Sequence, residues 1–545
     1  MQDIAHYDLK KLRLDKEPRP VQKELFEFTR DSILANKKFI MIDAPTGTGK
    51  SVYGVMVMDW FQKNYSATAT FDILTNSKIL QEQYTTEFDF MNSLWGKASY
   101  HCEKFNCDCG TGSEWARLQN VKCEGCPYAE AKYKFENGDV ALTNFHLFMT
   151  YKIYMPMAWK RTSSVLIIDE AHEFESVFCD FVTTKISRPL LRKNGFTDEE
   201  VIKALNVFGS YPEDLDIRDF VRIVNEDFLP VVKTVLNRLH REAEAGSMLA
   251  MKSGQSLMNN FLKWEILATE YNKMPDNWIL ECEHVKKYGK DKKMQEDYIE
   301  FVCQPVFAYP YLEDKIWKRY DFVIFMSGTI LDKSLFCKMN GLDHESAAYL
   351  AVDTPFPVEN RPIYFFKNIG KYTYKTKEQV WPKQKIVLEK ILKKHKNDKG
   401  LIYTVNYELQ GLVKQLDSDR FLAHDSTNRS ETLQHHYNSI EPTILVSPSM
   451  NIGVDLFEDY SRHQTILKMP YPNLKSKKIK KRMDIMPDTY GLSTVRDFIQ
   501  FYGRSIRSND DKAKTYVLDS CFNDVLKWSG RWIPKWVKDA IHYVD

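Results

Sequence analysis

Short apolar runs in two series constrain the fold of this 545-residue chain more than any other feature of its sequence. Each run is rich in β-branched or aromatic residues, and amphipathic helical stretches separate one run from the next. Buried parallel strands have this composition, because helices cover both faces of a parallel sheet. We therefore predict an α/β protein with two parallel sheets. The first series is Phe39–Ile42, Phe71–Leu74, Val165–Ile168 and Phe322–Met326, and the second is Leu401–Thr404, Ile444–Val446, Thr465–Leu467 and Thr515–Leu518.

The region 175–305 interrupts the first series and has a helical pattern. Within it, one apolar stripe recurs at helical spacing, and Pro230 predicts a break or kink in a second helical stretch. Such an insertion could serve only as structure or could contribute to a binding path. The stripe consists of Leu257, Phe261, Trp264, Ala268 and Tyr271.

Composition and charge exclude several classes of protein. Hydrophobic residues make up 43% of the chain and charged residues 28%, which is typical of a soluble protein with a packed core. The 76 basic and 74 acidic residues leave a net charge of +2, so any nucleic-acid site must be a local groove. No apolar run approaches the ~18 residues of a membrane helix, and the first residues lack the pattern of a signal peptide. We expect a cytosolic protein with no membrane contact.

A phosphate-binding loop follows the first predicted strand. In a strand–loop–helix arrangement, Gly47 and Gly49 let backbone N–H groups turn toward phosphate oxygens. Lys50 can reach the β- and γ-phosphates, and the Ser51 hydroxyl is a natural Mg²⁺ ligand. Ala44 stands where the usual pattern has its first glycine. The loop reads Ala44, Pro45, Thr46, Gly47, Thr48, Gly49, Lys50 and Ser51.

Two adjacent carboxylates end the strand Val165–Ile168. Asp169 is placed to hold Mg²⁺, and Glu170 to orient and polarise an attacking water. An Asp-Glu pair alone is usually a solvated turn. After a buried strand and a phosphate-binding loop, the pair indicates hydrolysis of a nucleoside triphosphate.

Further motifs continue into the second series of strands. Ser327-Gly328-Thr329 follows the strand Phe322–Met326, and Asn451-Ile452-Gly453-Val454-Asp455 follows another strand. Near the end of the chain, Gln500 precedes Arg504 and Arg507, two arginines that would share one helix face. Arginines that approach a γ-phosphate stabilise the charge that develops in the transition state.

The set and order of these motifs resemble superfamily 2 helicases, and the details are similar to the XPD/DinG group of iron–sulfur helicases. The resemblance covers nearly the whole chain. Five further segments carry it: Arg19–Gln22, similar to the adenine-reading Q motif; Leu74–Ser77; Thr143–His146; Met469–Pro472; and Trp532–Trp536.

The resemblance implies two RecA-like parallel-sheet lobes, with a small Fe–S cluster domain and a helical arch-like insertion in the first lobe. Lobe 1 would comprise residues 1–98, 136–174 and 306–355, the cluster domain 99–135, the insertion 175–305 and lobe 2 356–545.

It further implies an ATP-dependent DNA helicase that moves 5′→3′ along single-stranded DNA and unwinds forked duplex DNA. Ser327 and Thr329 would couple the nucleotide state to DNA binding. The implied catalytic residues are Lys50, Asp169, Glu170, Arg504 and Arg507, and Ser51 and Asp169 would hold Mg²⁺. The implied ATP-binding residues are Gln22, Ala44, Thr46, Gly47, Thr48, Gly49, Lys50, Ser51, Asp455 and Gln500.

Five of the ten cysteines fall between Cys102 and Cys126. Clustered cysteines in a cytosolic protein more often bind metal than form disulfides, and thiolates suit both Zn²⁺ and iron–sulfur clusters. The resemblance favours a [4Fe–4S] cluster, because Cys126 is followed by Pro-Tyr as in the family. It implies Cys102, Cys123 and Cys126 as ligands. Cys107 is favoured as the fourth ligand, with Cys109 as the alternative.

Two segments are candidates for contact with nucleic acid. The basic run Lys475–Arg482 could contact backbone phosphates or form a solvated surface. Aromatic and basic residues in Tyr128–Phe135 could stack on bases or could form the inner face of a short helix.

Other functions stay open at this point. We expect a monomer that binds single-stranded DNA. A translocase that remodels nucleoprotein complexes without unwinding, and a zinc-stabilised nucleotide switch, are the alternatives.

Overall fold

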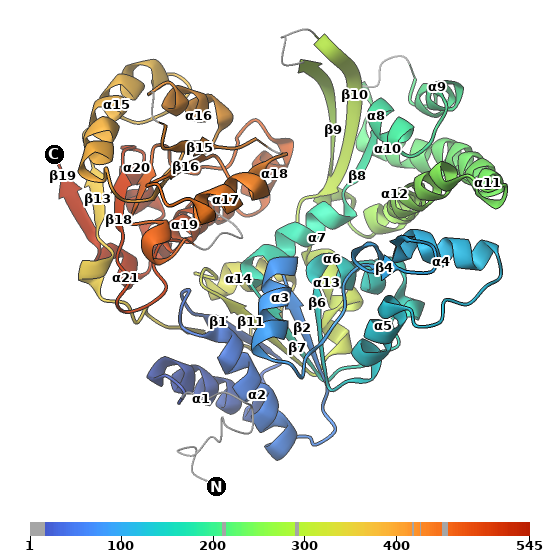
Figure 1. Cartoon of the computed structure of the whole chain (residues 1–545), viewed down its shortest axis with the longest axis horizontal. Coiled ribbons are helices and arrows are strands. Elements are labelled where there is room, and N and C mark those ends of the chain that lie inside the picture. The colour runs from blue at the N-terminus through green and yellow to red at the C-terminus, as the bar shows by residue number, and fades with distance from the viewer. Residues whose placement is uncertain (1–16, 210–213, 289–293, 417–418, 426, 450–455) are drawn as a thin grey trace.

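The computed structural model describes residues 17–209, 214–288, 294–416, 419–425, 427–449 and 456–545. Figure 1 shows two α/β lobes side by side, with a helical insertion and a small cysteine-bearing segment attached to the first lobe. The prediction of two parallel-sheet lobes is confirmed.

Lobe 1 contains a seven-stranded parallel sheet in the order β12-β1-β11-β7-β2-β6-β3. Its central strands are buried along their whole length, as expected for a sheet covered by helices on both faces. The strands are β1 (Phe39–Asp43), β2 (Phe71–Thr75), β3 (Asn92–Ser93), β6 (Val140–Asn144), β7 (Val165–Asp169), β11 (Phe322–Ser327) and β12 (Ala347–Ala351). The helices are α1 (Pro20–Leu34), α2 (Lys50–Asn64), α3 (Lys78–Glu87), α6 (Phe145–Met149), α7 (Phe174–Val182), α13 (Tyr309–Lys315) and α14 (Lys333–Asn340).

Lobe 2 contains a second seven-stranded parallel sheet, in the order β15-β16-β14-β17-β18-β13-β19. Its strands are β13 (Ile363–Phe366), β14 (Gly400–Tyr403), β15 (Phe421–Ala423), β16 (Ile444–Ser447), β17 (His463–Ile466), β18 (Lys514–Val517) and β19 (Ile541–Val544). The helices are α15 (Lys377–Lys394), α16 (Tyr407–Lys414), α17 (Arg429–Asn438), α18 (Lys477–Ile485), α19 (Asp488–Tyr502), α20 (Phe522–Trp528) and α21 (Lys535–Lys538).

The insertion is only partly helical, which corrects the sequence-based expectation for 175–305. The insertion also contains a three-stranded antiparallel sheet in the order β8-β10-β9, in which β8 precedes the helices and β9 and β10 follow them. Strands β9 and β10 form a long hairpin that projects from the molecule (Figure 1). The break predicted at Pro230 is confirmed: α10 is followed by a π-helical turn, Val224–Phe228, and α11 begins at Leu229 with Pro230 in its first turn. The elements are β8 (Thr184–Ser187), α8 (Arg188–Lys193), α9 (Asp198–Asn206), α10 (Ile217–Ile223), α11 (Leu229–Glu244), α12 (Met248–Lys273), β9 (Trp278–Tyr288) and β10 (Met294–Pro305).

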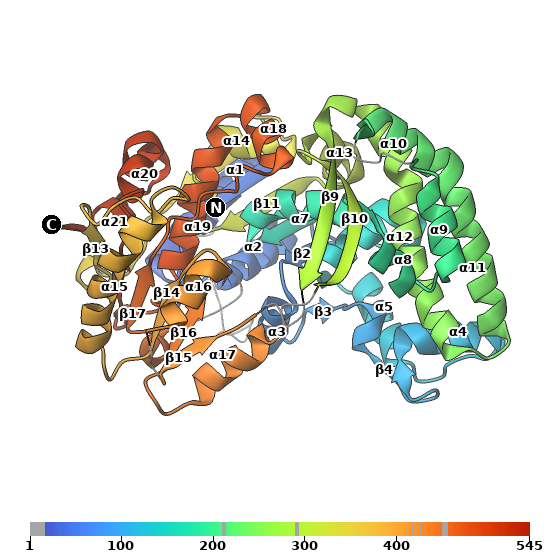
Figure 2. The same ribbon diagram turned by 90° about the horizontal axis from the view of Figure 1, so that it is seen from above.

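The cysteine-bearing segment packs against the insertion. It comprises β4 (His101–Cys102), β5 (Cys107–Asp108), α4 (Cys109–Leu118) and α5 (Pro127–Asn137). Gln255 of α12 donates a hydrogen bond of 2.9 Å to the Gly110 carbonyl, and Figure 2 shows α4 beside the ends of α11 and α12. The cysteine-bearing segment and the insertion are therefore in contact, although the contacting residues are far apart in the sequence.

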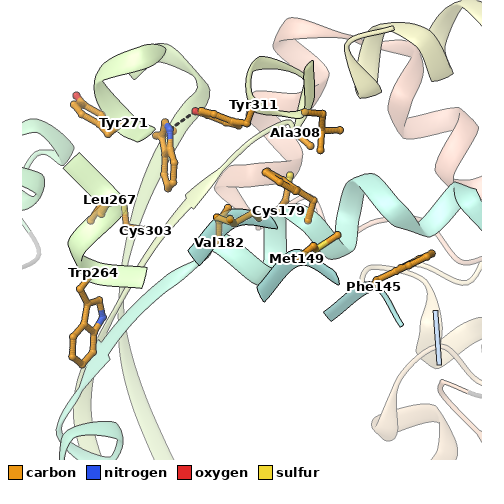
Figure 3. Packing of buried hydrophobic residues seen from close by; sticks show 14 of the residues in the cluster. Phe145, Met149, Cys179, Val182, Trp264, Leu267, Tyr271, Cys303, Ala308 and Tyr311 are labelled. Atoms are coloured by element: carbon orange, nitrogen blue, oxygen red, sulfur yellow. Dashed lines mark hydrogen bonds between the residues drawn. The ribbon is translucent and has the colours of Figure 1, made fainter. Parts of the chain in front are cut away.

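The apolar stripe predicted on α12 forms part of the core that joins the insertion to lobe 1. Leu257 and Trp264 are fully buried, and Phe261 and Tyr271 nearly so. Figure 3 shows Trp264 and Leu267 on the insertion side and Cys179 and Val182 of α7 on the lobe 1 side of one continuous cluster. The insertion is thus fixed to the helix α7, which follows the Asp169-Glu170 pair.

Candidate active site between the lobes

The phosphate-binding loop has the strand–loop–helix form that the sequence predicts. β1 ends at Asp43, and α2 begins at Lys50 with Gly49 as its N-cap. Gly47 and Gly49 both have a φ of 80°, which favours glycine. A Cβ at Gly47 would lie 2.3 Å from Phe356 Cζ, and one at Gly49 would lie 2.2 Å from Gln22 Nε2. The conformation therefore favours glycine at both positions, and at Gly47 the Phe356 ring also leaves little space for a side chain.

Gln22 and Arg19 of the predicted Q motif lie directly against this loop. Gln22 Nε2 donates to the Gly49 carbonyl at 3.1 Å, and Gln22 Oε1 accepts from the Arg19 N–H at 2.8 Å. Arg19 Nη1 donates to the Gly47 carbonyl at 2.5 Å. Within the loop, the buried Thr48 hydroxyl donates to the Pro45 carbonyl, and Lys50 Nζ donates to the Ala44 carbonyl at 3.1 Å. The backbone of the loop is thus fixed by side chains from α1 and from the loop itself.

Asp169 and Glu170 lie at the end of β7, beside the phosphate-binding loop. Burial and the neighbouring Glu170 raise the pKa of Asp169 to about 6, and the Tyr84 hydroxyl donates to its Oδ2 at 2.9 Å. Burial alone would raise the pKa of Glu170 as well. Its net pKa is lowered, because the charges of Lys50 and the lobe 2 arginines favour the carboxylate.

Glu170 is therefore ionised, and it has an unusual backbone conformation with a φ of 52°. Glu170 Oε2 is buried and accepts no hydrogen bond within the described part of the chain, although it lies 3.4 Å from His172 Nδ1. A buried carboxylate oxygen with remaining acceptor capacity is suited to receive a hydrogen bond from a water molecule.

His172 connects this strand end to the Ser327-Gly328-Thr329 motif. Its Nδ1 lies 2.8 Å from Ser327 Oγ, and burial lowers the pKa of His172 to about 3. The imidazole is therefore neutral at physiological pH, and its contact with Ser327 does not titrate there. The Thr329 N–H donates to Ser327 Oγ at 3.0 Å, which extends the connection.

Lobe 2 meets this site through residues at the end of α19. Gln500 Nε2 donates to Thr329 Oγ1 at 2.9 Å, and the Thr46 hydroxyl donates to the Gly503 carbonyl at 3.4 Å. Gln500 thus contacts the Ser-Gly-Thr motif of lobe 1.

Arg504 and Arg507 do not share a helix face, because α19 ends at Tyr502, before either of them. Both nevertheless lie close enough to lower the pKa of Glu170. The cleft between the lobes therefore brings Lys50 and Glu170 from one side together with two arginines from the other. Asp455 falls outside the described residues.

Arg496 is a site residue that the sequence analysis missed. It lies on α19, one turn before Gln500. Its Nε donates to the Thr329 carbonyl at 3.3 Å, and its Nη1 donates to the His172 carbonyl at 3.4 Å. Its spacing of four residues from Gln500 was the available signal, since residues at i and i+4 share a helix face. Arg496 thus connects lobe 2 by hydrogen bonds to Thr329 and to His172 of lobe 1.

Five thiols gather in the cysteine segment. Cys109 is buried, and its Sγ lies 3.7 Å from Cys126 Sγ. Cys102 Sγ would lie 2.5 Å from a Cβ at Gly112, so the glycine leaves room for the sulfur. Burial and neighbouring thiols raise the pKa of Cys109 to about 12.

The pKa values of Cys107 and Cys123 are raised by burial and by Cys102. Thiols that disfavour one another as thiolates become favourable ligands when a cation binds among them. Among the residues that the structure describes, no three His, Cys, Asp or Glu side chains are arranged as a metal-ion site. The chemistry of the five donors fits a thiolate-bound cluster.

The two candidate nucleic-acid segments prove to be helices with mixed roles. Tyr128 and Phe135 of α5 are buried and form its inner face, whereas Tyr133 is 69% exposed. In α18, Arg482 forms an ion pair with Glu175 of lobe 1, with Nη2 2.9 Å from Glu175 Oε2. The basic run is therefore not simply a solvated surface.

Comparisons with known families agree with this architecture. The model of a helicase C-terminal domain matches residues 387–540, in lobe 2. The model of the res subunit of type III restriction enzymes matches residues 15–191, which include the phosphate-binding loop and the Asp169-Glu170 pair. A comparison with curated protein sequences finds no match. No helix in the described ranges is both long and apolar enough to cross a membrane.

Solved structures share the fold over nearly the whole chain at 15% sequence identity. An XPD helicase aligns with 97% of this chain and 100% of its own, with a TM-score of 0.68. A second XPD structure, described as apo, aligns with 96% of this chain and 100% of its own, with a TM-score of 0.62. Xpd4 of S. tokodaii aligns over 97% and 100% of the two chains, with a TM-score of 0.55. One segment of lobe 2 thus matches a helicase C-terminal domain, and the chain shares the fold of the XPD structures over nearly its whole length.

Proposed function

We propose that this protein is an ATP-dependent DNA helicase that moves along single-stranded DNA. The observation that carries the proposal is the cleft in which Lys50 and Glu170 of lobe 1 face the Arg504 and Arg507 charges of lobe 2. A cation on the phosphates, an ionised carboxylate for water and arginines for the transition state are the parts that phosphoryl transfer needs. Because they come from two lobes, hydrolysis requires the lobes to close.

In the proposed mechanism, ATP lies across the phosphate-binding loop, with Lys50 on its β- and γ-phosphates and Gln22 toward the adenine. Ser51 and Asp169 would hold Mg²⁺, which would supply positive charge to neutralise the phosphates. Glu170 orients the attacking water and accepts its proton, while Arg504 and Arg507 stabilise the charge on the γ-phosphate. When inorganic phosphate leaves after hydrolysis, the arginines lose their anionic partner, and lobe 2 is released.

Opening and closing of the lobes around the nucleotide would change nucleic-acid binding through lobe 2. Gln500 and Arg496 contact Thr329, and His172 contacts Ser327, so closure changes the Ser-Gly-Thr motif and lobe 2 together. We propose that repeated closure moves the protein 5′→3′, the polarity implied by the family resemblance, and that the cysteine segment acts as a wedge at the fork. A monomer suffices for this cycle, since both sides of the cleft belong to one chain.

We propose further that Cys102, Cys123, Cys126 and one other cysteine hold a [4Fe–4S] cluster. The cluster would fix the small segment as a rigid body. The sequence favours Cys107 as the fourth ligand. The burial of Cys109 and its 3.7 Å contact with Cys126 support Cys109 instead, and we adopt that assignment.

Replacing single cysteines tests this assignment. Cys109→Ser is expected to lose most of the iron from protein purified without oxygen, whereas Cys107→Ser keeps about four iron atoms per chain. Iron content and visible absorbance provide the measurement. Cys282→Ser, on β9 outside the segment, is the matched control. If Cys109→Ser kept its full iron content and Cys107→Ser lost it, Cys107 would be the fourth ligand. Protein that contained stoichiometric zinc and no iron would exclude the iron–sulfur cluster.

The ATPase test of the function uses the anaerobically purified full chain. We expect single-stranded DNA to stimulate ATP hydrolysis strongly, and Lys50→Ala to abolish the stimulated rate because the phosphates lose their cation. Stimulation that persists in Lys50→Ala would mean that another site hydrolyses ATP. Absence of stimulation in the unchanged protein would favour a nucleotide switch over a motor.

A further inference from the structure

The two lobes also meet at a second place, away from the phosphate-binding loop. Helix α18 of lobe 2 contacts α7 of lobe 1, where the two terminal guanidinium nitrogens of Arg482 donate to the carboxylate of Glu175 at 3.1 and 2.9 Å. Arg482 also donates to the Val306 carbonyl at 3.0 Å, and its guanidinium lies 4.3 Å from the centre of the Phe307 ring. We call this set of contacts the α18 contact.

Other residues of lobe 1 and of the insertion complete the α18 contact. Glu175 Oε1 accepts a further hydrogen bond from the Ala308 N–H at 3.3 Å. Lys478 Nζ lies 3.5 Å from Asp180 Oδ1, and the Lys477 N–H donates to Glu281 Oε1 at 2.8 Å. Three of the six basic residues of the run predicted to touch phosphates, with Arg482 among them, therefore join lobe 2 to lobe 1 or to its insertion.

Burial makes the Glu175–Arg482 pair costly to separate. The two side chains are only 7% and 14% exposed. Burial alone would raise the pKa of Glu175, but Arg482 lowers it, so the pair is held as ions. Removing one partner of a buried ion pair leaves an uncompensated charge, which is among the most destabilising changes in proteins.

Contacts on the nucleotide side of the lobes include weaker ones. The Thr46–Gly503 hydrogen bond is a single contact of 3.4 Å, and Gln500 donates one neutral hydrogen bond to Thr329. Arg496 donates to two carbonyls, at 3.3 and 3.4 Å, but pairs with no carboxylate of lobe 1 among the hydrogen bonds of the described residues. Single neutral hydrogen bonds exchange readily with water. Relative movement of the lobes is therefore easier at the nucleotide side than at the α18 contact.

The location of Glu175 gives the α18 contact a role in catalysis. Glu175 follows Glu170 by five residues, at the start of α7, with His172 between them. A displacement of α7 therefore moves the segment that sets the direction of the Glu170 and His172 side chains.

We propose that Glu175 and Arg482 are positioning residues for ATP hydrolysis and that their contact is the fixed pivot about which the lobes open and close. The pair keeps α7, and with it Glu170, aligned with lobe 2 while the nucleotide side opens. This inference rests on the proposed ATP-driven cycle.

Amide hydrogen exchange of the full chain tests the pivot. The measurement compares the protein alone with the protein bound to single-stranded DNA and a non-hydrolysable ATP analogue. We expect the protection of 174–182 and 477–485 to stay unchanged while that of 500–507 rises. A change of protection in 174–182 and 477–485 on binding would show that the contact opens during the cycle, which would overturn the proposal.

Steady-state kinetics test the positioning role. Arg482→Met should lower the DNA-stimulated kcat about tenfold with little change in the KM for ATP, because Glu170 loses its alignment while the phosphate-binding loop is intact. Combining it with Glu175→Met should restore most of kcat, since no unpaired charge remains. Lys371→Met, which removes an exposed ion pair with Asp524 in lobe 2, is the matched control.

The outcomes separate this inference from the proposed function. A lower melting temperature of Arg482→Met with an unchanged kcat would show a purely structural contact and overturn the positioning role. Absence of DNA-stimulated hydrolysis in the unchanged protein would instead contradict the helicase proposal itself.

Discussion

Replacing Glu170 by glutamine is expected to lower the turnover of ATP by about 10²- to 10⁴-fold while ATP still binds. The amide has nearly the shape of the carboxylate but cannot accept a proton from the attacking water. Binding of ATP depends on the phosphate-binding loop, which the change does not touch. Rapid-quench kinetics for hydrolysis and a fluorescent nucleotide for binding provide the two measurements.

Glu173 provides the matched control for this prediction. It lies three residues further along, is half-buried and accepts a hydrogen bond of 2.9 Å from Asn76 Nδ2. Burial leaves the pKa of Glu173 raised overall, whereas nearby positive charges lower that of Glu170, so Glu173→Gln should change turnover by less than about tenfold. If both variants lost the same amount of ATP turnover, a catalytic role for Glu170 would be contradicted. Loss of ATP binding in Glu170→Gln would show a structural effect instead.

Replacing Arg504 or Arg507 by alanine is the second change with a large expected effect. Each arginine contributes positive charge at Glu170, next to the position proposed for the γ-phosphate, and an arginine that stabilises the transition state is worth about 10³–10⁵ in rate. We expect the rate to fall within that range for at least one of the two variants. The KM for ATP should change far less, because the charge develops mainly in the transition state.

Single-turnover hydrolysis of the two variants measures this loss. Arg531→Ala removes an exposed arginine of lobe 2 that pairs with Asp488, and it controls for a general loss of positive charge. If neither arginine variant lost more activity than Arg531→Ala, a role for the arginines in the transition state would be contradicted. A rise in KM with an unchanged kcat would assign them to ground-state binding.

The parallel sheets could be predicted from sequence because each central strand is buried on both faces. Runs such as Val165–Ile168 and Phe322–Met326 carry enough apolar residues in succession to be recognised without their neighbours. The hairpin of β9 and β10 could not be recognised in this way. Its strands carry Glu281, Glu283 and Asp297 among their residues, so a helical reading of the whole insertion was equally consistent with the sequence.

The site was predictable where its residues are contiguous. The phosphate-binding loop and the Asp169-Glu170 pair each lie at the end of one strand, so their geometry depends on a few neighbouring residues. Arg496 and the Glu175–Arg482 pair escaped the sequence analysis, because they depend on how the lobes dock across more than 300 residues of chain. No local pattern distinguishes Arg482 from the other basic residues of its run.

The site in the cysteine segment could be predicted only in part. Its spacing could predict a thiolate site but could not choose among five donors. The structure adds burial and one short sulfur–sulfur distance, between Cys109 and Cys126, which depend on the packing of α4 against α5.

Strand displacement by the anaerobically purified protein tests the central claim most directly. The measurement follows release of a labelled strand from duplexes that carry a single-stranded tail at either the 5′ or the 3′ end, with ATP and Mg²⁺ present. We predict rapid displacement from the 5′-tailed duplex, little from the 3′-tailed one, and none from either with Lys50→Ala. Hydrolysis of ATP stimulated by single-stranded DNA, without displacement from either duplex, would contradict the helicase account and indicate a translocase that does not unwind.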